Sequence, residues 1–252
     1  MSLAVEHLHK SFGGLRVVED VTFATDPQAI TGLIGPNGAG KSTLFALITG
    51  YQRPDSGSVR FGATSMRGLS ASARARHGVA RTFQIPRPFR HLSVRQNLMA
   101  AGPRQPGEHP FNLLFRRHAV ARRERELEQR ADAMLAFLGL EAVTHALSGT
   151  LSGGQLKLLE LGRALMTEPR YILLDEPFAG VNPVLIEQIA ARIRTLAARG
   201  TGFLIVEHNL PALAALACHL LVMDRGRLIA AGSPDTVLAD RAVQDAYIGG
   251  AA

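Results

Sequence analysis

Short apolar runs separated by turn residues fill the beginning of the chain. Apolar and polar positions alternate within residues 3–30, and the runs are broken by Gly13 with Gly14 and by Asp26 with Pro27. Successive side chains of a strand point to opposite faces, so this alternation is typical of strands buried on one side. The segment predicts antiparallel strands joined by turns.

After Ile30 the pattern changes to continuous apolar runs that alternate with helical stretches. The runs YILL, GFLIV and LLVM stand directly before Asp175, Glu207 and Asp224. Such runs are typical of parallel strands that are buried on both faces. A segment with helical spacing lies between the first two runs, and its apolar positions are Ile186, Ile189, Ile193 and Leu196.

This helical segment has clear boundary residues. Asn182 fits its N-cap, Pro183 its first turn and Gly200 its C-terminal end. A strand, a helix and a second strand in this order are typical of a parallel sheet. The pattern therefore predicts an α/β fold.

The middle third of the chain is helical in pattern and strongly charged. It runs from about Ser93 to Leu147, and residues 115–140 mix arginines with glutamates before a leucine and phenylalanine stripe. We interpret the segment as a solvated helix with paired charges, the alternative being a helix that binds nucleic acid. It predicts a helical lobe inserted within the α/β core.

Composition narrows the class of protein without naming a function. The 252 residues are 46% hydrophobic and suffice for one large α/β domain, or for a core domain with a smaller inserted lobe. The net charge of +7 would suit nucleic acid, anionic lipid or a nucleotide ligand. The chain has only three lysines beside its many arginines, which is the pattern that genome-wide codon bias produces. We therefore do not interpret the positive charge as a sign of nucleic-acid binding.

Two further features concern the cellular environment. The first residues turn polar too early for a signal peptide, and the longest apolar stretch, residues 210–223, is too short to span a membrane. We therefore expect a cytoplasmic protein. The single cysteine, Cys218, stands among Ala and Leu, where we expect a small buried hydrophobe and not a nucleophile.

The segment GPNGAGKST, residues 35–43, carries the first chemical signal. Gly35, Gly40, Lys41 and Ser42 fit the pattern G-x-x-x-x-G-K-[ST] directly after a predicted strand. Such a loop aims backbone N–H groups and the positive end of the next helix at a polyphosphate. Lys41 would reach the terminal phosphates and Ser42 would bind Mg²⁺. The alternative is a glycine-rich turn that binds nothing.

Two acids end the run YILL. Asp175 is placed to hold Mg²⁺, through water, and Glu176 to orient or deprotonate an attacking water. Strands often end in an acid, so the two acids alone indicate little. They indicate a catalytic site because a phosphate loop precedes them in the chain.

The segment LSGGQ, at residues 151–155, predicts a second anion site. Ser152 fits the N-cap of a leucine-rich helix, and the following glycines leave the end of that helix unobstructed. Two copies facing head to tail would let the Ser152 loop of one copy close on phosphates held by the Lys41 loop of the other.

In this order and spacing, GPNGAGKST, LSGGQ and ILLDEP resemble the nucleotide-binding subunit of ABC transporters over essentially the whole chain. The resemblance implies an α/β fold: a P-loop NTPase core with a mainly parallel sheet, an N-terminal antiparallel β part and an inserted α-helical lobe. It implies a single ABC ATPase domain over residues 1–252, with the core at 1–85 and 160–252 and the helical lobe at about 86–159. ATP and Mg²⁺ are the implied cofactors, and ATP hydrolysis is the implied activity.

The resemblance also assigns roles to three less conspicuous residues. Gln84 in VARTFQ matches a glutamine that contacts Mg²⁺ and water, and His208 in LIVEHNL matches a switch histidine at the γ-phosphate. Phe12 matches an aromatic that stacks on adenine, although it could equally be a core residue. The expected catalytic residues are Glu176, His208 and Gln84, and the expected metal ligands are Ser42, Gln84 and Asp175. The expected nucleotide contacts are Phe12, Gly35, Pro36, Asn37, Gly38, Ala39, Gly40, Lys41, Ser42, Thr43, Ser152, Gly153, Gly154 and Gln155.

Finer features distinguish groups within the family. Asn182 stands where the family usually has an aspartate; the amide keeps the capping role but loses the charge. The segments ARTFQ and Asn-Pro, with the C-terminal tail, resemble ATP-binding subunits of bacterial importers for branched-chain amino acids; amides and urea are further candidate cargo. EPFAGV and SVRQNLMA are similar to the ATPase of lipopolysaccharide export, against which ARTFQ argues. A soluble ABC ATPase of translation or DNA repair is an alternative from another class.

These resemblances imply a set of partners. We expect integral-membrane permease subunits and a second ATP-binding subunit, either an identical copy or a close paralogue, paired head to tail. A periplasmic or extracellular solute-binding protein would take part indirectly, and no nucleic acid is expected. The chain would then lie in the cytoplasm, peripheral on the inner face of the cell membrane through the permease.

Overall fold

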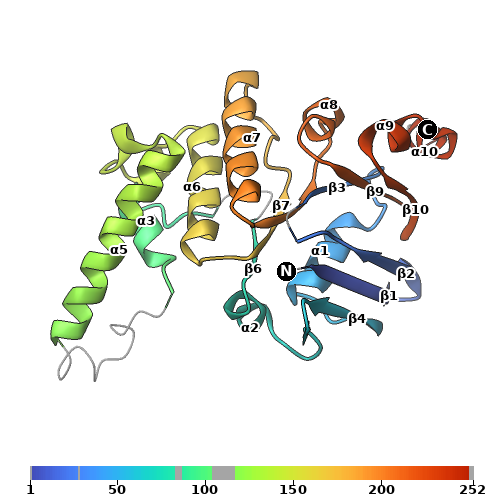
Figure 1. Ribbon diagram of the computed structural model, residues 1–252, viewed down its shortest axis with the longest axis horizontal. Coiled ribbons are helices and arrows are strands. Elements are labelled where there is room, and N and C mark those ends of the chain that lie inside the picture. The colour runs from blue at the N-terminus through green and yellow to red at the C-terminus, as the bar shows by residue number, and fades with distance from the viewer. Residues whose placement is uncertain (1, 28, 83–86, 104–116, 250–252) are drawn as a thin grey trace. The chain divides into compact units, whose positions relative to one another are not determined.

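The computed structural model describes residues 2–27, 29–82, 87–103 and 117–249 (Figure 1). The first strands form an antiparallel sheet with the order β2-β1-β4-β5, which confirms the prediction for the start of the chain. Along β1 the side chains of Leu3, Val5 and Leu8 are buried. The bounds are Leu3–Phe12 for β1, Leu15–Ala24 for β2, Ser56–Phe61 for β4 and Thr64–Ser65 for β5.

A second sheet has the strand order β10-β9-β3-β8-β7-β6 within the described residues. The strands from β9 to β6 are parallel to their neighbours, and β10 is antiparallel to β9. Every residue of β3, β7 and β8 is buried, which explains their continuous apolar runs. The bounds are Ile30–Ile34 (β3), Val79–Arg81 (β6), Tyr171–Asp175 (β7), Gly202–Val206 (β8), His219–Asp224 (β9) and Arg227–Gly232 (β10).

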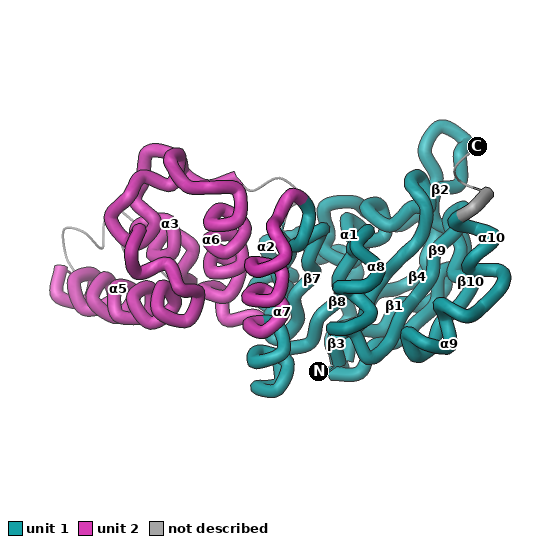
Figure 2. Tube along the Cα trace, turned by 90° about the horizontal axis from the view of Figure 1, so that it is seen from above, with its two compact units in different colours: residues 1–84, 170–179, 193–252 teal, residues 85–169, 180–192 magenta. Residues whose placement is uncertain are grey.

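The chain divides into two compact units (Figure 2). Unit 1 comprises residues 1–84, 170–179 and 193–252 and contains both sheets. Its helix α1 buries four apolar side chains in one core that includes residues of both sheets, because each sheet turns an apolar face inward. The helices of this unit are α1 (Lys41–Thr49), α2 (Ala71–Arg76), α8 (Leu210–Ala214), α9 (Pro234–Leu238) and α10 (Arg241–Gly249).

Unit 2 is helical and comprises residues 85–169 and 180–192. These limits differ from those expected for the lobe, about 86–159, because α6 continues to Met166 and the first part of α7 packs with it. Leu185 of α7 lies against Gly154, where an added Cβ would come within 2.0 Å of its Cδ2. The main helices are α3 (Val94–Ala100), α5 (Arg117–Leu138), α6 (Gly153–Met166) and α7 (Pro183–Ala198), the last of which continues into unit 1.

The charges of α5 are largely paired within unit 2. Arg95 of α3 contacts Glu128 and Asp132 of α5, each at 2.8 Å, and Arg123 contacts Glu126 at 3.0 Å. An apolar stripe of the same helix, which includes Val120, Leu127, Ala131, Leu135 and Leu138, is buried. These contacts support the interpretation of α5 as a solvated helix with paired charges.

The expectation for Cys218 is wrong. The residue is exposed, and its N–H and Sγ both contact the carbonyl of Ile30, at 3.0 and 3.4 Å. The apolar residues around Cys218 in the sequence predicted burial, but the cysteine lies in the turn between α8 and β9. In this turn the buried residues are Leu216 and Ala217.

We predict that the buried Arg74 anchors the end of α1. Its guanidinium donates to the carbonyls of Leu47 and Ile48 at 2.7 and 2.6 Å, in the last turn of α1. Carbonyls there have no partner four residues ahead within the helix, and that of Leu47 also accepts the N–H of the C-cap Gly50 at 3.4 Å. Arg74→Met should lower the free energy of unfolding by about 2–3 kcal/mol, because charge-assisted bonds to buried carbonyls are lost. Urea unfolding followed by circular dichroism measures this. The control is Arg76→Met, because Arg76 is exposed and lies on the same helix as Arg74, α2. An equal loss of stability for both variants would contradict the prediction.

Candidate functional site

The glycine-rich loop lies between β3 and α1, as its sequence predicts. Gly40 is the N-cap of α1 with φ of 98°, and no side chain caps the helix. A Cβ at Gly40 would lie 2.4 Å from the carbonyl oxygen of Val17, so only glycine fits. The first N–H groups of α1 have no partner within the helix, and the helix dipole places partial positive charge at this end. The loop therefore presents donors suited to an anion.

Lys41 lies folded over this loop. Its ammonium donates to the carbonyl oxygens of Gly35 at 2.6 Å and Pro36 at 2.8 Å. Burial lowers the pKa of Lys41, and the nearby charges of Glu176 and Asp175 act in the opposite direction. A polyphosphate entering the loop would meet a cation that is already in place.

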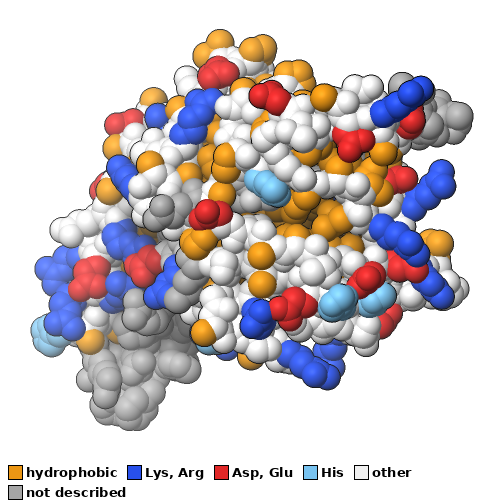
Figure 3. Space-filling model, turned by 45° about the vertical axis from the view of Figure 1, so that its right-hand side comes forward, with side chains coloured by type: hydrophobic (Ala, Val, Ile, Leu, Met, Phe, Trp, Pro, Cys, Tyr) orange, Lys and Arg blue, Asp and Glu red, His pale blue; other side chains and the backbone are white. Residues whose placement is uncertain are grey.

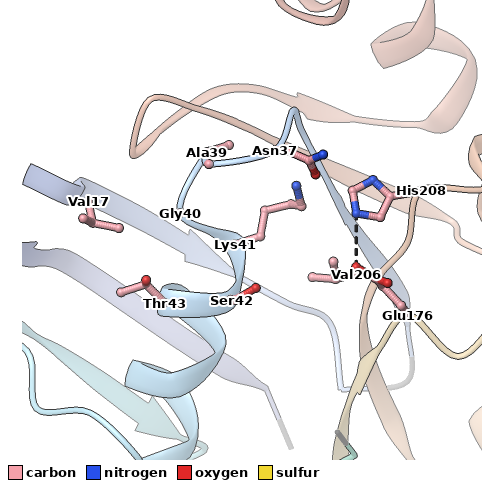
Figure 4. A pocket seen from close by; sticks show the side chains of 11 residues that line it. Val17, Asn37, Ala39, Gly40, Lys41, Ser42, Thr43, Glu176, Val206 and His208 are labelled. Carbon is pink, nitrogen blue, oxygen red and sulfur yellow. Dashed lines mark ion pairs between the residues drawn. The ribbon is translucent and has the colours of Figure 1, made fainter. Parts of the chain in front are cut away.

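A cavity of about 320 Å³ opens over the loop (Figure 4). Four segments that are distant in sequence meet there: β2 at Val17, the phosphate loop with the start of α1, the end of β7 and the end of β8. The open cavity with its row of backbone donors and one ammonium fits a polyphosphate chain. It is lined by Val17, Asn37, Gly38, Ala39, Gly40, Lys41, Ser42, Thr43, Glu176, Val206 and His208.

Glu176 and His208 contact each other in the cavity lining (Figure 4). Oε1 of Glu176 lies 3.1 Å from Nε2 of His208, and the side chains are 16% and 47% exposed. The backbone of Glu176 has a φ of 49°, in the left-handed region that disfavours residues with a Cβ. The contact joins two residues that the sequence proposes separately as catalytic.

Asp175 ends β7, and its carboxylate is already bonded. Oδ2 accepts a bond from Arg81 at 2.8 Å, and both side chains are largely buried. The Arg81 guanidinium lies over the rings of Phe45 and Tyr51, 5.7 and 5.8 Å from their centroids. Sequence reasoning did not identify Arg81, because nothing in its own segment signals a partner at the end of β7.

Glu207 is a second buried acid that the sequence left without a role. It follows β8, and its carboxylate accepts the N–H groups of Phe178, His208 and Asn209. Burial raises the pKa of Glu207 and the charge of Glu176 adds to the rise, whereas the three backbone bonds lower it. A polar residue after an apolar strand was its only signal.

Ser152 and its neighbours lie in unit 2 at the start of α6. Oγ of Ser152 accepts the N–H of Gln155 at 3.3 Å, and Oε1 of Gln155 accepts the N–H of Ser152 at 3.0 Å. This capping box confirms the predicted helix start. Asn182 likewise caps α7, because its Oδ1 accepts the N–H of Leu185 at 2.9 Å.

Several expected site residues are not among those that line the cavity, namely Phe12, Gly35, Pro36, Asp175, Ser152, Gly153, Gly154 and Gln155. Phe12 ends β1 just before Gly13, is 45% exposed, and has the ammonium of Lys10 over its ring at 5.3 Å. It is not among the residues that line the cavity. Gln84 falls outside the residues that the structure describes. Within the described part, no helix combines the length and apolar character needed to cross a membrane.

Comparison with known proteins identifies relatives over nearly the full length of the chain. The sequence model of the ABC transporter family matches residues 18–179, and that of the branched-chain amino acid ATP-binding cassette transporter matches residues 227–252. The chain is 39% identical to the probable branched-chain amino acid transport ATP-binding protein LivG of Methanocaldococcus jannaschii, covering 98% of the chain and 97% of the relative. It is 36% identical to the lipopolysaccharide export ATP-binding protein LptB of Escherichia coli, with the same coverage.

A solved structure shows the same fold. The crystal structure of an ATP-binding cassette of an ABC transporter in its ADP conformation is similar with a TM-score of 0.85 and 39% identity. It covers 99% of each chain. The expected arrangement of a mainly parallel sheet, an antiparallel β part and helices is thereby confirmed.

We predict that the Lys41 ammonium contributes directly to nucleotide affinity. Lys41→Ala should raise the Kd for ATP by about 10- to 100-fold, because a charge-assisted bond to phosphate is lost. Isothermal titration calorimetry on the full chain measures this. Arg76→Ala removes an exposed cation elsewhere and should leave the Kd unchanged. Equal affinity of the Lys41 variant and the wild type would remove this side chain from the site.

Proposed function

The chain belongs to the ABC transporter family of ATP-binding proteins, and on this premise we propose that it powers the import of branched-chain amino acids by hydrolysing ATP at the Lys41 loop. ATP-binding subunits of this family are ATPases coupled to transport, and this chain is one of them. The observation that carries the proposed site is the cavity that the Lys41 loop lines together with the contacting pair Glu176 and His208.

The phosphates would be held by groups already present in the loop. The N–H groups at the start of α1 would bind them, and the Lys41 ammonium would exchange the loop carbonyls that it contacts now for phosphate oxygens. Described residues include no cluster of three or more His, Cys, Asp or Glu able to hold a metal alone. Mg²⁺ bound with a polyphosphate needs few protein ligands, because phosphate oxygens and water fill its other positions. The hydroxyl of Ser42 and the carboxylate of Asp175, acting through water, would hold such an ion, and Gln84 is the third expected ligand. When bound, the ion would neutralise charge on the phosphates.

Hydrolysis would proceed through the side chains opposite the loop. Glu176 would orient the attacking water and accept its proton, and His208 would donate a hydrogen bond to the γ-phosphate. The 3.1 Å contact between them supports this division, because each side chain fixes the orientation of the other. Phe12, exposed at the end of β1, would stack on adenine.

A second copy, or a close paralogue, would complete the site. The start of α6, at Ser152, Gly153, Gly154 and Gln155, has an ordered capping box and N–H groups suited to an anion. In a head-to-tail pair these residues would close on the phosphates bound by the partner. Asn182 would act in this pair as the cap of α7 rather than as a charged group.

The cargo and the other partners follow from the relatives. The match of the C-terminal residues to the branched-chain amino acid model, and the identity to LivG, favour an importer. The chain would then work on the inner face of the membrane, bound to permease subunits that receive cargo from a solute-binding protein. The 36% identity to LptB supports a lipopolysaccharide export system as the second candidate.

The surface gives little support for a nucleic-acid partner. On the face drawn in Figure 3, basic and acidic side chains are interspersed. The arginines of α5 that contact acids, such as Arg123 with Glu126, reduce the positive field that nucleic acid would need. A soluble ABC ATPase acting on RNA or DNA is therefore the least supported alternative.

We predict that Glu176 determines the rate of hydrolysis. Glu176→Gln should slow turnover by about 10²- to 10⁴-fold, the usual contribution of a general base, and should leave ATP binding intact. Phosphate release and calorimetric titration measure the two quantities. Wild-type turnover by this variant would show that Glu176 is not the base.

The head-to-tail arrangement predicts complementation between two inactive variants. Lys41→Ala and Ser152→Arg should each be inactive alone, because every site in either homodimer has one defect. A mixed dimer should regain ATPase activity, since one of its sites combines an intact Lys41 with an intact Ser152. The measurement is the ATPase rate of the mixture against each variant alone. A mixture no more active than its components would exclude a site shared between subunits.

Co-purification tests the transport partners. Tagged Glu176→Gln, extracted from native membranes with ATP, should retain two hydrophobic permease proteins, which mass spectrometry identifies. Their solute-binding protein can then be titrated with leucine, amides and urea. Recovery of lipopolysaccharide export components would favour the second candidate. Recovery of ribosomal or DNA-associated proteins alone would overturn the transport proposal.

A further inference from the structure

Glu207 is a buried carboxylate for which the proposed hydrolysis gives no role. It is 3% exposed. Its Oε1 accepts the N–H of Phe178 at 2.5 Å, and its Oε2 accepts the N–H groups of His208 at 3.0 Å and Asn209 at 3.3 Å. A carboxylate at this depth is costly unless hydrogen bonds compensate it, and here both oxygens are bonded.

The two oxygens of Glu207 hold two different turns. Phe178 stands two residues after Glu176, in the turn that leaves β7, and His208 opens the turn that leaves β8. A backbone hydrogen bond also joins the first turn to β8, because the N–H of Glu176 donates to the carbonyl of Val206 at 2.9 Å. The carboxylate of Glu207 is thus a side-chain bridge between the segments that carry the two proposed catalytic groups.

The geometry of Glu176 requires such support. Its φ of 49° is unfavourable for a residue with a Cβ, and conformations of this kind persist only where the surroundings impose them. The same turn brings Oε1 of Glu176 to 3.1 Å from Nε2 of His208. A relaxation of either turn would change both the backbone of Glu176 and this contact.

We propose that Glu207 is a positioning residue for ATP hydrolysis, which holds the Glu176 and His208 turns in the relative placement that aligns these two side chains. It acts through them and does not itself touch the nucleotide, since it is absent from the cavity lining. The inference rests on the proposed function, in which Glu176 and His208 act on the water and the γ-phosphate.

The substitution Glu207→Gln tests this role at nearly constant size. Its amide nitrogen cannot accept an N–H, so the bridge to one of the two turns is lost. We expect kcat to fall by about 10- to 100-fold, the effect of a small misplacement of catalytic groups. The Kd for ATP should stay within about threefold of the wild type, because the Lys41 loop is not bonded to Glu207. Glu207→Asp, too short to reach both turns, should show the same split if the glutamine variant does not fold.

Asn209→Ala is the matched control. The side chain of Asn209 caps α8 by accepting the N–H of Ala212 at 3.2 Å, so its loss disturbs structure directly beside His208. The bridge from Glu207 is made to the backbone of Asn209 and survives the change. This variant should lose thermal stability and keep a wild-type kcat. A kcat as low as that of Glu207→Gln would attribute the effect to general disturbance and overturn the proposal.

A double variant and an NMR spectrum test whether Glu207 affects kcat through Glu176 and His208. In Glu176→Gln, the additional change Glu207→Gln should lower turnover by less than it does in the wild type, because the group that it positions is already lost. The ¹⁵N signals of His208 in histidine-labelled protein should shift in Glu207→Gln without nucleotide, since the contact to Glu176 changes.

The outcomes separate this inference from the proposed function. A wild-type kcat for Glu207→Gln, full additivity with Glu176→Gln, or an unchanged His208 signal would overturn the role of Glu207. A parallel loss of ATP affinity and kcat would also overturn it, since it would show a structural role alone. If Glu176→Gln itself turned over at the wild-type rate, the catalytic role that the proposed function gives Glu176 would fail, whatever the result for Glu207→Gln.

Discussion

The register of the parallel sheet is the constraint on which the site depends. Leu33 of β3 and Asp175 of β7 both pair with Val206 of β8, so three strands end at the same level. Loops that follow parallel strands meet at one edge of the sheet, which is where open α/β sheets bind ligands. The phosphate loop, Glu176 and His208 converge for this reason, although 165 positions separate residues 43 and 208 in the chain. Burial of all three strands on both faces keeps that register fixed.

Buried charge is the second common element. Lys41, Asp175 and Glu207 are all buried, and each is bonded: to loop carbonyls, to Arg81 and to backbone N–H groups. An ionised group in a low-dielectric region is tolerated only with such partners. The partners of Lys41 are neutral carbonyls, which a phosphate can replace with a stronger, charged acceptor. The other two charges are bonded in ways that fix the ends of β7 and β8.

The sequence predicted the parts of the site that are local. Each of these parts depends on residues a few positions apart, so the sequence alone shows its pattern. They are the phosphate loop, the N-caps at Ser152 and Asn182 and the buried strands. Arg81 and Asp175 are 94 positions apart, and Phe178 and Glu207 are 29 apart. No periodicity links such pairs, because their proximity arises from strand order. The prediction that Cys218 is buried was wrong for a related reason. Its apolar neighbours indicate the average burial of the segment, whereas the exposure of Cys218 itself depends on its place in a turn.

The strained turn at Glu176 and the buried acid at Glu207 belong to one arrangement. A left-handed backbone at Glu176 and a carboxylate buried beside another carboxylate are both unfavourable alone. Each makes the other tolerable, because the turn presents the N–H of Phe178 to Glu207, and the resulting bond holds the turn. The same carboxylate also bonds the N–H of His208. A displacement of one turn is therefore transmitted to the other through a single side chain, which links the placement of the base to that of the histidine.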